Sequence, residues 1–330
     1  YDIGKIIAKE SRAVGIHWNF SPVVDVNNNP ANPIINVRSF SEDPDMVIDY
    51  GIQFMKGLQD HGMLATAKHF PGHGDTETDS HSSLAMISSD SLRLWTLEIP
   101  PFQSMINNGV DAVMVGHMHA PDYQPDSDIP ASMDPFWVND ILRNRLNFNG
   151  AIVTDGMGMG GITKNYSDAF ALVEAVNAGC DIIIQNYDIR GSINTIEKAV
   201  MDGRISESRI NESALKMLKM KEKVGLHLKH NVFLENIQDN LGHKEHRATA
   251  KKIASEAITC VKLDEAMLPL TQYQDQNLFV FDIYDSEYNH SISSITKGLI
   301  SSGLRVRPYQ IDGSDSENML NAILNEIPEN

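Results

Sequence analysis

Residues 63–84 read MLATAKHFPGHGDTETDSHSSL, an apolar run of strand length that leads directly into a loop rich in glycine, histidine and aspartate. Apolar runs of this length recur along the first part of the chain, and a helical pattern follows each of them. This alternation is typical of βα units around a parallel sheet, so the sequence predicts an α/β fold. The expected strands are 16–24, 63–69, 110–117, 150–155 and 180–185, and the expected helices lie near 43–61, 90–108, 134–148, 167–178, 190–202 and 206–224.

The number of strands bears on how the sheet is completed. Five strands are too few to close an eight-stranded barrel. The strand 16–24 follows a helical pattern, YDIGKIIAKESRAVG, that already starts at residue 1. We therefore expect a (β/α)8 TIM-type barrel, or a distorted relative, that is truncated at its N-terminal end.

The pattern changes after residue 225, where a polar stretch rich in histidine begins. Beyond it we expect a helix at 245–258, a strand at 278–284, a helix at 290–301 and a strand at 303–309. The expected domains are a barrel over 1–225, a linker over 226–245 and the start of an α/β sandwich over 246–330.

Composition excludes several classes of function. The chain has 44 acidic and 27 basic side chains, for a net charge of −17, and so offers no basic surface to nucleic acid. It has no apolar run of the roughly 18 to 20 residues that a membrane span needs. The two cysteines, Cys180 and Cys260, lie in apolar runs, where we expect small buried side chains rather than a disulfide.

Polar residues follow the expected strands at their carboxyl ends, which is where barrels collect their catalytic groups. The residues are Asp25, Lys68, His69, His117, His119 and Asp155. Each of them alone could be an ordinary cap or turn residue. Their joint placement favours a functional site.

The loop 68–84 is the densest cluster of such residues. Gly72 and Gly74 permit backbone conformations that are closed to other residues, so the loop can fold back over a site. Asp79 and His81 are two residues apart, which allows the carboxylate to bind one imidazole nitrogen while the other faces a substrate. We expect this pair to donate and accept a proton near neutral pH.

Two further segments supply candidates. Asp155 ends an apolar strand in VTDGMGMGGI, residues 153–162, where it could form a glycosyl ester or simply cap the next helix. Arg38 lies in a loop rich in asparagine and proline, where its guanidinium could bind sugar hydroxyls or pair with Glu42 or Asp43.

The segment KHFPGHGDT followed by D-S-H, the V-T-D strand end and the R-S-F triplet together resemble glycoside hydrolase family 3, in particular its β-N-acetylglucosaminidase branch, which includes enzymes of peptidoglycan turnover. The resemblance covers residues 1–225 well and 245–330 weakly. Two features depart from the family pattern: an earlier Asp-Gln-Glu-Gly-Gly-type motif is missing, and VGHMHAP holds a second histidine, His119, to which we assign no role.

The resemblance implies a role for each candidate. It implies that Asp155 is the nucleophile and that His81, oriented by Asp79, is the acid/base of a retaining glycosidase. It implies sugar contacts by Lys68, His69 and Arg38, and we expect Asp25 and His117 to bind substrate as well. It implies no cofactor and no metal. The expected substrate is a terminal N-acetylglucosaminide, and a two-domain relative favours a periplasmic or extracellular location over a cytoplasmic one.

Three alternatives stay open. A histidine in place of a carboxylic acid removes a negative charge beside the leaving group, so phosphorolysis is a variant of the same chemistry. The histidines and aspartates of the loop, together with His117 and His119, could instead serve a metal-dependent hydrolase. A non-catalytic carbohydrate-binding protein is the third possibility. Neither the natural glycan nor the oligomeric state can be read from the sequence.

Overall fold

The computed structural model describes residues 1–76, 84–87, 91–121, 123–124, 127–185, 188–228, 231–260, 262, 268–284, 293–312, 321 and 325. Contacts between Cα atoms divide the chain into two units, Tyr1–Ser255 and Glu256–Asn330. Each unit is described here by itself. The domain boundaries that we expect near 225 and 246 stay predictions.

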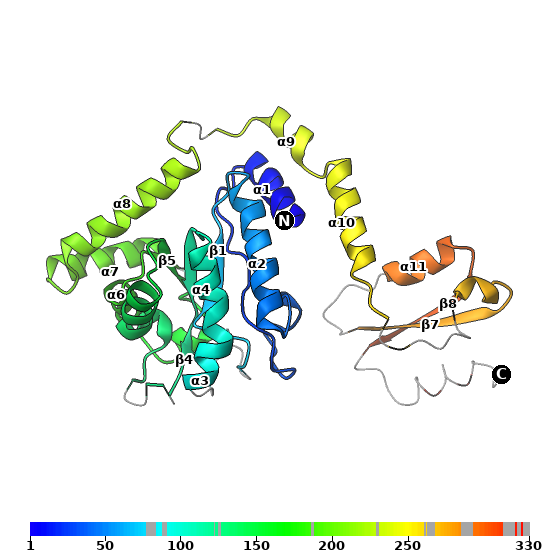
Figure 1. The fold of residues 1–330 in the computed structure, drawn as a ribbon, viewed down its shortest axis with the longest axis horizontal. Helices are drawn as coiled ribbons and strands as arrows, with labels where there is room; N and C mark the ends of the chain where they lie inside the picture. The colour runs from blue at the N-terminus through cyan, green and yellow to red at the C-terminus, as the bar shows by residue number, and fades with distance from the viewer. Residues whose placement is uncertain are drawn as a thin grey trace. The chain divides into compact units, whose positions relative to one another are not determined.

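Four parallel strands form the sheet of the first unit (Figure 1). In their spatial order they are β1 (Thr66–Phe70), β3 (Ala112–Val115), β5 (Ala151–Gly156) and β6 (Ile182–Ile184). All three pairings are parallel, so the carboxyl ends of the strands share one edge. A mixed α/β fold with a parallel sheet is therefore confirmed. Within the described ranges this sheet is open and does not close into a barrel.

The first expected strand forms only in part. Two isolated parallel bridges, from Trp18 to Leu64 and from Val23 to Lys68, join it to the neighbouring segment. Pro22 lies between the two bridges and has no N–H to donate, which interrupts a continuous ladder. Backbone hydrogen bonds on both sides of the proline still hold the segment beside β1.

The main helices lie close to their expected positions and begin at recognisable caps. Asp43, Ser167 and Ser206 each accept a hydrogen bond from a backbone N–H in the first turn of the helix that follows. The helices of the first unit are α1 (Asp2–Ala13), α2 (Pro44–Gln59), α4 (Ile99–Asn107), α5 (Gly160–Thr163), α6 (Asp168–Ala178), α7 (Ile189–Met201), α8 (Glu207–Lys223), α9 (Leu234–Asn240) and α10 (Lys244–Glu256).

Two expected helices differ in kind from what the sequence suggests. The segment 90–108 begins as α3 (Ser91–Arg93), widens into a π-helical segment, η2 (Leu94–Glu98), and then continues as α4. Prolines 100 and 101 supply no N–H to the preceding turn, which disfavours regular α-helical bonding there. The expected helix at 134–148 is likewise π-helical, as η4 (Phe136–Arg145).

Several short elements were not expected. Two short strands, β2 (Ala85–Met86) and β4 (Met118–His119), pair in parallel. In the chain, β2 lies in the connection after β1, and β4 lies in the connection after β3. Single helical turns form at η1 (Asn36–Arg38) and η3 (Ala131–Met133). Each of these short elements lies in the chain between a strand and the helix that follows it.

An aromatic cluster fixes the carboxyl end of β1 in the core. Phe70 packs edge-on against Phe102 of α4, with ring centroids 5.4 Å apart, and against Trp137 of η4, at 6.4 Å. All three side chains are buried. Edge-to-face packing of this kind favours one orientation of the strand and of the loop that leaves it.

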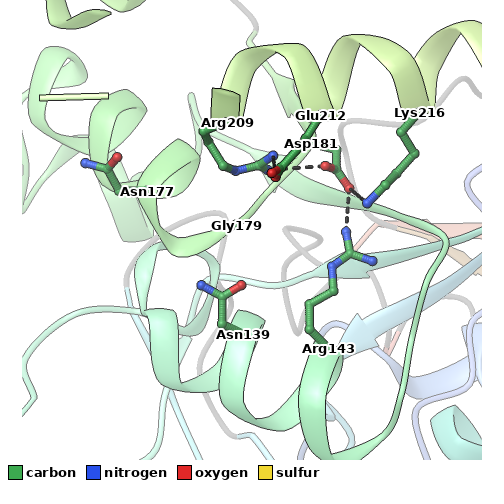
Figure 2. Close-up of a pocket in the computed structure, with 8 residues that line it drawn as sticks. All are labelled: Asn139, Arg143, Asn177, Gly179, Asp181, Arg209, Glu212 and Lys216. Carbon is green, nitrogen blue, oxygen red and sulfur yellow. Dashed lines mark hydrogen bonds and ion pairs between the residues drawn. The ribbon is translucent and has the colours of Figure 1, made fainter. Parts of the chain in front are cut away.

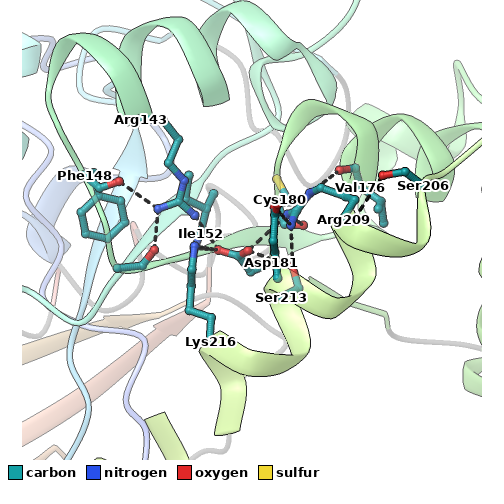
Figure 3. Close-up of polar contacts among 12 residues, drawn as sticks. Arg143, Phe148, Ile152, Val176, Cys180, Asp181, Ser206, Arg209, Ser213 and Lys216 are labelled. Atoms are coloured by element: carbon teal, nitrogen blue, oxygen red, sulfur yellow. Dashed lines mark hydrogen bonds and ion pairs between the residues drawn. The ribbon is translucent and has the colours of Figure 1, made fainter. Parts of the chain in front are cut away.

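The amino ends of the strands are fastened to α8 through Asp181, which directly precedes β6 (Figure 3). Its Oδ2 accepts from Arg143 at 2.6 Å and from Lys216 at 3.0 Å, and its Oδ1 accepts from Arg209 at 3.2 Å. The backbone N–H of Ile152 also donates to Oδ2, at 3.0 Å. This carboxylate therefore joins two strands and two helices at the edge of the sheet away from the polar loops.

The expected linker contains α9, which contacts α1. Glu10 of α1 accepts from the backbone N–H of Gly242 at 3.0 Å and pairs with His246 Nδ1 at 2.7 Å. This part of the chain therefore packs on α1 within the first unit.

The second unit contains a βαβ arrangement. Strands β7 (Asn277–Tyr284) and β8 (Arg305–Asp312) pair in parallel. Helix α11 (Ser294–Ser301) lies between them in the chain, and the helical turn η5 (Leu270–Tyr273) precedes β7. Tyr309 stacks on Phe281 with ring centroids 5.4 Å apart. The two expected strands and the expected helix of this region are confirmed.

Two smaller expectations have separate outcomes. Cys180 is buried, as expected, whereas Cys260 is exposed, and both are free thiols. The prediction for Cys260 is therefore wrong, because few neighbours cover the apolar run in which it lies. Of the helices that the structure describes, none combines the length and the apolar character needed to cross a bilayer.

Candidate functional site

Asp25 is the centre of a buried hydrogen-bond cluster at the carboxyl end of β1. Its Oδ1 accepts from the backbone N–H of His73 at 2.8 Å, and its Oδ2 accepts from His69 Nδ1 at 2.7 Å. Burial alone raises the pKa of Asp25, but the charge and hydrogen bond of His69, together with His73, outweigh burial and lower it. Asp25 therefore stays ionised and orients the His69 ring.

His69 connects Asp25 to Arg38. A carboxylate only accepts, so Nδ1 of His69 carries the proton of this hydrogen bond and its Nε2 is left for another contact. Arg38 Nη2 lies 3.4 Å from this Nε2, and Arg38 Nη1 donates to the carbonyl of Ile34 at 3.2 Å. The exposed Arg38 side chain is thus turned towards the site, and neither of these contacts is with Glu42 or Asp43.

The loop after β1 is pressed against the segment that carries Asp25. Gly72 has a φ of +133°, which few other residues adopt. Gly74 lies so near to Val26 that an added Cβ would be 1.7 Å from the Val26 carbonyl oxygen. Asn32 donates to the carbonyls of His73, at 2.7 Å, and of Gly74, at 3.0 Å. Both glycines are therefore needed for the loop to fold back, one for its dihedral angle and one for its lack of a side chain.

Asp155 lies near the carboxyl end of β5, where a buried histidine supports the backbone. The N–H of Gly156 donates to Asp155 Oδ1 at 2.8 Å. His117 Nε2 donates to the carbonyl of Gly156 at 2.9 Å, and its Nδ1 lies 2.8 Å from Ser132 Oγ. These contacts give His117 a role in holding the strand end, and its expected contact with substrate stays a prediction.

The electrostatic environment keeps Asp155 ionised. Burial raises its pKa, but the charges of His69 and His117, the Gly156 N–H and the charge of Lys68 lower it to below the usual value. The pKa of Lys68 is itself lowered, by burial first and then by Arg38, while Asp155 raises it. These mutual effects identify Lys68, His69 and His117 as electrostatic neighbours of Asp155.

The structure thus brings most of the expected site residues to one edge of the sheet. Asp25, Lys68, His69, Arg38 and Asp155 act on one another through hydrogen bonds or charge. Asp79 and His81, the expected acid/base pair, lie outside the described residues. His119 contacts the carbonyl of Ser127 through Nε2.

Sequence reasoning missed Glu98, which lies under this loop. Its side chain is 1% exposed, and Asn28 Nδ2 donates to its Oε1 at 3.0 Å. A signal was present, because Glu98 occupies the helical stripe of buried positions that includes Leu94, Phe102 and Met105. A charged residue on such a stripe is unusual and indicates a special environment.

The described histidines that the metal-dependent alternative names are bound to protein groups. His69 binds Asp25 with one ring nitrogen and faces Arg38 with the other, and His117 is engaged at both nitrogens. Within the ranges that the structure covers, no three histidine, cysteine or acidic side chains converge as metal ligands would.

Fold and site together define a parallel α/β protein of the kind that carries its chemistry at the carboxyl ends of its strands. The chain belongs to glycosyl hydrolase family 3, whose N-terminal domain matches residues 1–220. The family resemblance noted in the sequence is thereby confirmed.

Individual relatives give the same placement. The chain is 34% identical over 287 residues to a β-N-acetylglucosaminidase/β-glucosidase of Cellulomonas fimi, which covers 84% of this chain and 51% of that protein. A family 3 β-N-acetylglucosaminidase structure from Paenibacillus sp. str. FPU-7 superposes with a TM-score of 0.86 at 32% identity, covering 99% of this chain and 63% of that one. The structure of a β-glucoside phosphorylase superposes with a TM-score of 0.86 at 27% identity, covering 93% and 58%. The chain spans about half the length of the curated relatives that it matches.

Proposed function

We propose that this chain carries the catalytic site of a retaining exo-β-N-acetylglucosaminidase that removes terminal N-acetylglucosamine from glycans or muropeptides. The observation that carries the proposal is Asp155, a carboxylate with a lowered pKa beside the charges of His69 and Lys68. A carboxylate that stays ionised at the end of a strand is suited to attack an anomeric carbon. Relatives of the same family that are named for this activity support it.

In the first step, an oxygen of Asp155 forms a bond to the anomeric carbon while the bond from that carbon to the leaving oxygen breaks. The electron pair of the broken bond stays on the leaving oxygen, which takes a proton from His81. Asp79 orients the imidazole and stabilises its protonated form. The product of this step is a glycosyl ester on Asp155.

In the second step, water adds to the same carbon and His81 takes the proton that the water releases. The bond between the carbon and the Asp155 oxygen breaks, which restores the carboxylate. Two displacements return the sugar with its configuration retained. Lys68, His69 and Arg38 would bind the ring hydroxyls, with Asp25 acting through the His69 ring that it orients.

The proposal includes a (β/α)8 barrel as the scaffold. Segment 17–24 and strands β1, β3, β5 and β6 lie side by side in chain order, which is the order of successive barrel strands. A barrel would also explain why the polar residues gather at one edge.

A trapping experiment tests the nucleophile directly. Incubation with an N-acetylglucosaminyl substrate analogue that carries fluorine on its ring slows the second step, and we expect mass spectrometry of peptides to find the sugar on Asp155. A label on another carboxylate, or turnover of a nitrophenyl N-acetylglucosaminide with inversion at the anomeric carbon, contradicts the mechanism.

Phosphorolysis is a second candidate, because a β-glucoside phosphorylase shares this fold over 93% of the chain. A neutral imidazole beside the leaving group repels phosphate less than a carboxylate would. The products decide between the two reactions. Release of a sugar 1-phosphate in phosphate buffer identifies the phosphorylase, and release of free sugar at the same rate with and without phosphate identifies the hydrolase.

A further inference from the structure

Glu98 is a buried carboxyl group that the proposed mechanism does not use. It is the last residue of η2, and its side chain is 1% exposed. Oε1 accepts a hydrogen bond from Asn28 Nδ2 at 3.0 Å. Oε2 is buried and has no hydrogen-bond partner among the described residues. A carboxylate in this place would lack most of the hydrogen bonds that replace water.

The free oxygen faces the backbone of the loop that follows β1. A Cβ added to Gly72 would lie 2.5 Å from Glu98 Oε2 and 2.7 Å from Glu98 Cβ, so the carboxyl group packs directly on the Gly72 backbone. Gly72 stands between His69 and His73, which both donate backbone N–H groups to Asp25. Contact at Gly72 therefore reaches the two residues that surround the Asp25 carboxylate.

Other groups also hold the loop. Asn32 binds the carbonyls of His73 and Gly74, and Gly74 lies against the Val26 backbone. Glu98 and the segment that holds Val26 and Asn32 thus both contact the loop, and Asn28 joins this segment to Glu98. Residues 79 and 81, the proposed acid/base pair, follow this loop directly in the chain.

Charge makes the contact sensitive to ionisation. The charged groups that act on Glu98 are Asp25 of the segment before η1, Asp75 of the loop and Arg93 of α3. Arg93 pairs with Asp75 at 2.9 Å, so one cation is shared with another carboxylate. Burial, together with Asp25 and Asp75, raises the pKa of Glu98 to about 8, against the hydrogen bond of Asn28 and the charge of Arg93.

We propose that Glu98 is a positioning residue for the sugar site, whose neutral carboxyl group supports the loop at Gly72 and so sets the placement of His69 and His73 around Asp25. Ionisation of Glu98 places an unpartnered charge beside Asp25 and Asp75, which displaces the loop and weakens sugar binding. The role rests on the proposed function, because it acts on the residues that would bind the sugar.

The pH dependence of activity tests this role. Glu98→Gln keeps the shape of the side chain and is neutral at every pH, Glu98→Ala removes the support, and Glu197→Gln on the exposed face of α7 is the matched control. The measurement is kcat and KM for a nitrophenyl N-acetylglucosaminide from about pH 5.5 to about pH 9.5.

We expect the KM of the wild-type protein and of Glu197→Gln to rise above about pH 8, whereas loss of the proton from His81 lowers kcat with rising pH in every variant. Glu98→Gln retains kcat/KM within about threefold at pH 6.5 and lacks this alkaline rise in KM, and Glu98→Ala loses about tenfold or more in kcat/KM at every pH. An unchanged alkaline rise in KM in Glu98→Gln overturns the proposal, whether or not the alanine variant folds.

A second measurement does not depend on activity. The folded protein keeps the proton of Glu98 up to a pKa of about 8, whereas the unfolded chain releases it near the ordinary value of 4.5. The neutral carboxyl group therefore stabilises most below the unfolded pKa, and this stability is lost as the pH rises towards 8. We expect the Tm of the wild-type protein to fall relative to Glu98→Gln by roughly 10 °C across this range.

The two measurements separate the two proposals. A wild-type protein that turns over no N-acetylglucosaminide, but shows the pH-dependent difference in Tm, sinks the proposed function and leaves the neutral Glu98 contact supported. Equal Tm differences at pH 5 and pH 8 sink the Glu98 proposal, whatever the activity.

Discussion

The two edges of the parallel sheet hold partly buried carboxylates with opposite hydrogen-bonding partners. At the amino edge, Asp181 accepts hydrogen bonds from Arg143, Arg209 and Lys216, and both of its oxygens are engaged (Figures 2 and 3). At the carboxyl edge, Asp155 has a described hydrogen bond from the adjacent backbone N–H, at 2.8 Å, and cations act on it by charge alone. Among the described residues, cations bind both oxygens of the first carboxylate, whereas the second accepts only the hydrogen bond from Gly156.

The amino edge repeats its arrangement at a second strand. Asp111 precedes β3, accepts from the backbone N–H of Ala65 at 3.1 Å and pairs with Lys223 of α8. Arg209, Lys216 and Lys223 follow one another at intervals of seven residues, so they lie along one face of α8. The helix thus bridges the beginnings of two strands.

A pocket beside Asp181 shows how little freedom such charges keep. It has a volume of about 350 Å3 and is lined by Asn139, Arg143, Asn177, Gly179, Asp181, Arg209, Glu212 and Lys216 (Figure 2). All three of its cations already bind the Asp181 carboxylate. Paired charges of this kind stabilise a fold, whereas a carboxylate with open lone pairs can react.

The largest effect is expected at the carboxyl edge of the sheet, which holds Asp155. Replacing Asp155 with alanine removes the proposed nucleophile, and we expect kcat for a nitrophenyl N-acetylglucosaminide to fall by at least roughly a thousandfold. Circular dichroism and Tm should stay close to those of the wild type, since few hydrogen bonds are lost. Activity within tenfold of the wild type refutes the contrast between the two edges.

The next largest effect is expected at the amino edge of the sheet, which holds Asp181. Replacing Asp181 with alanine leaves three buried or half-buried cations without their shared partner, and we expect about 3 to 5 kcal/mol lower free energy of unfolding in urea. At a temperature where the variant is folded, its kcat should match that of the wild type. A large loss of kcat with unchanged stability reverses the assignment of the two edges.

A moderate effect is expected at Arg38, on the rim of the carboxyl edge. Lysine keeps the charge but loses the planar group that reaches both His69 Nε2 and the Ile34 carbonyl. We expect Arg38→Lys to raise KM by about tenfold while kcat changes by less than about threefold. A pure loss of kcat would assign Arg38 to the chemical step rather than to binding.

The smallest effect is expected at Lys223. Its side chain is 54% exposed, unlike the 27% of Lys216, so solvent screens its pair with Asp111. We expect Lys223→Gln to lower the free energy of unfolding by no more than about 1 kcal/mol. A loss as large as that of the Asp181 variant would show that exposure does not govern the strength of these pairs.

The strands and most helices could be predicted because their signals are local. Four of the five expected strands overlap the runs that predict them to within one residue at the carboxyl end, and caps such as Ser167 and Ser206 mark where helices begin. The two differences from the expected elements both occur next to prolines. Pro22 interrupts the first strand, and the paired prolines after Glu98 accompany the π-helical segment.

The sequence predicted the polar residues of the candidate site but not the residues that hold its loop in place. Lys68, His69 and Asp155 stand out because each polar group follows an apolar strand. Glu98 and Asn32 do not stand out in this way, because their roles come from contacts with a loop that is distant in the chain.

The sequence by itself determined which segments pair as parallel strands and which polar residues end them, because alternating hydrophobic patterns and turn residues act over a few neighbours. Only the tertiary structure decided that, in the part of the chain that it describes, cations hydrogen-bond Asp181 but not Asp155. The protonation of Glu98 belongs to the same class of property. Such states depend on burial and on charges that come together from separate segments, and a local sequence pattern does not encode the distances between those segments.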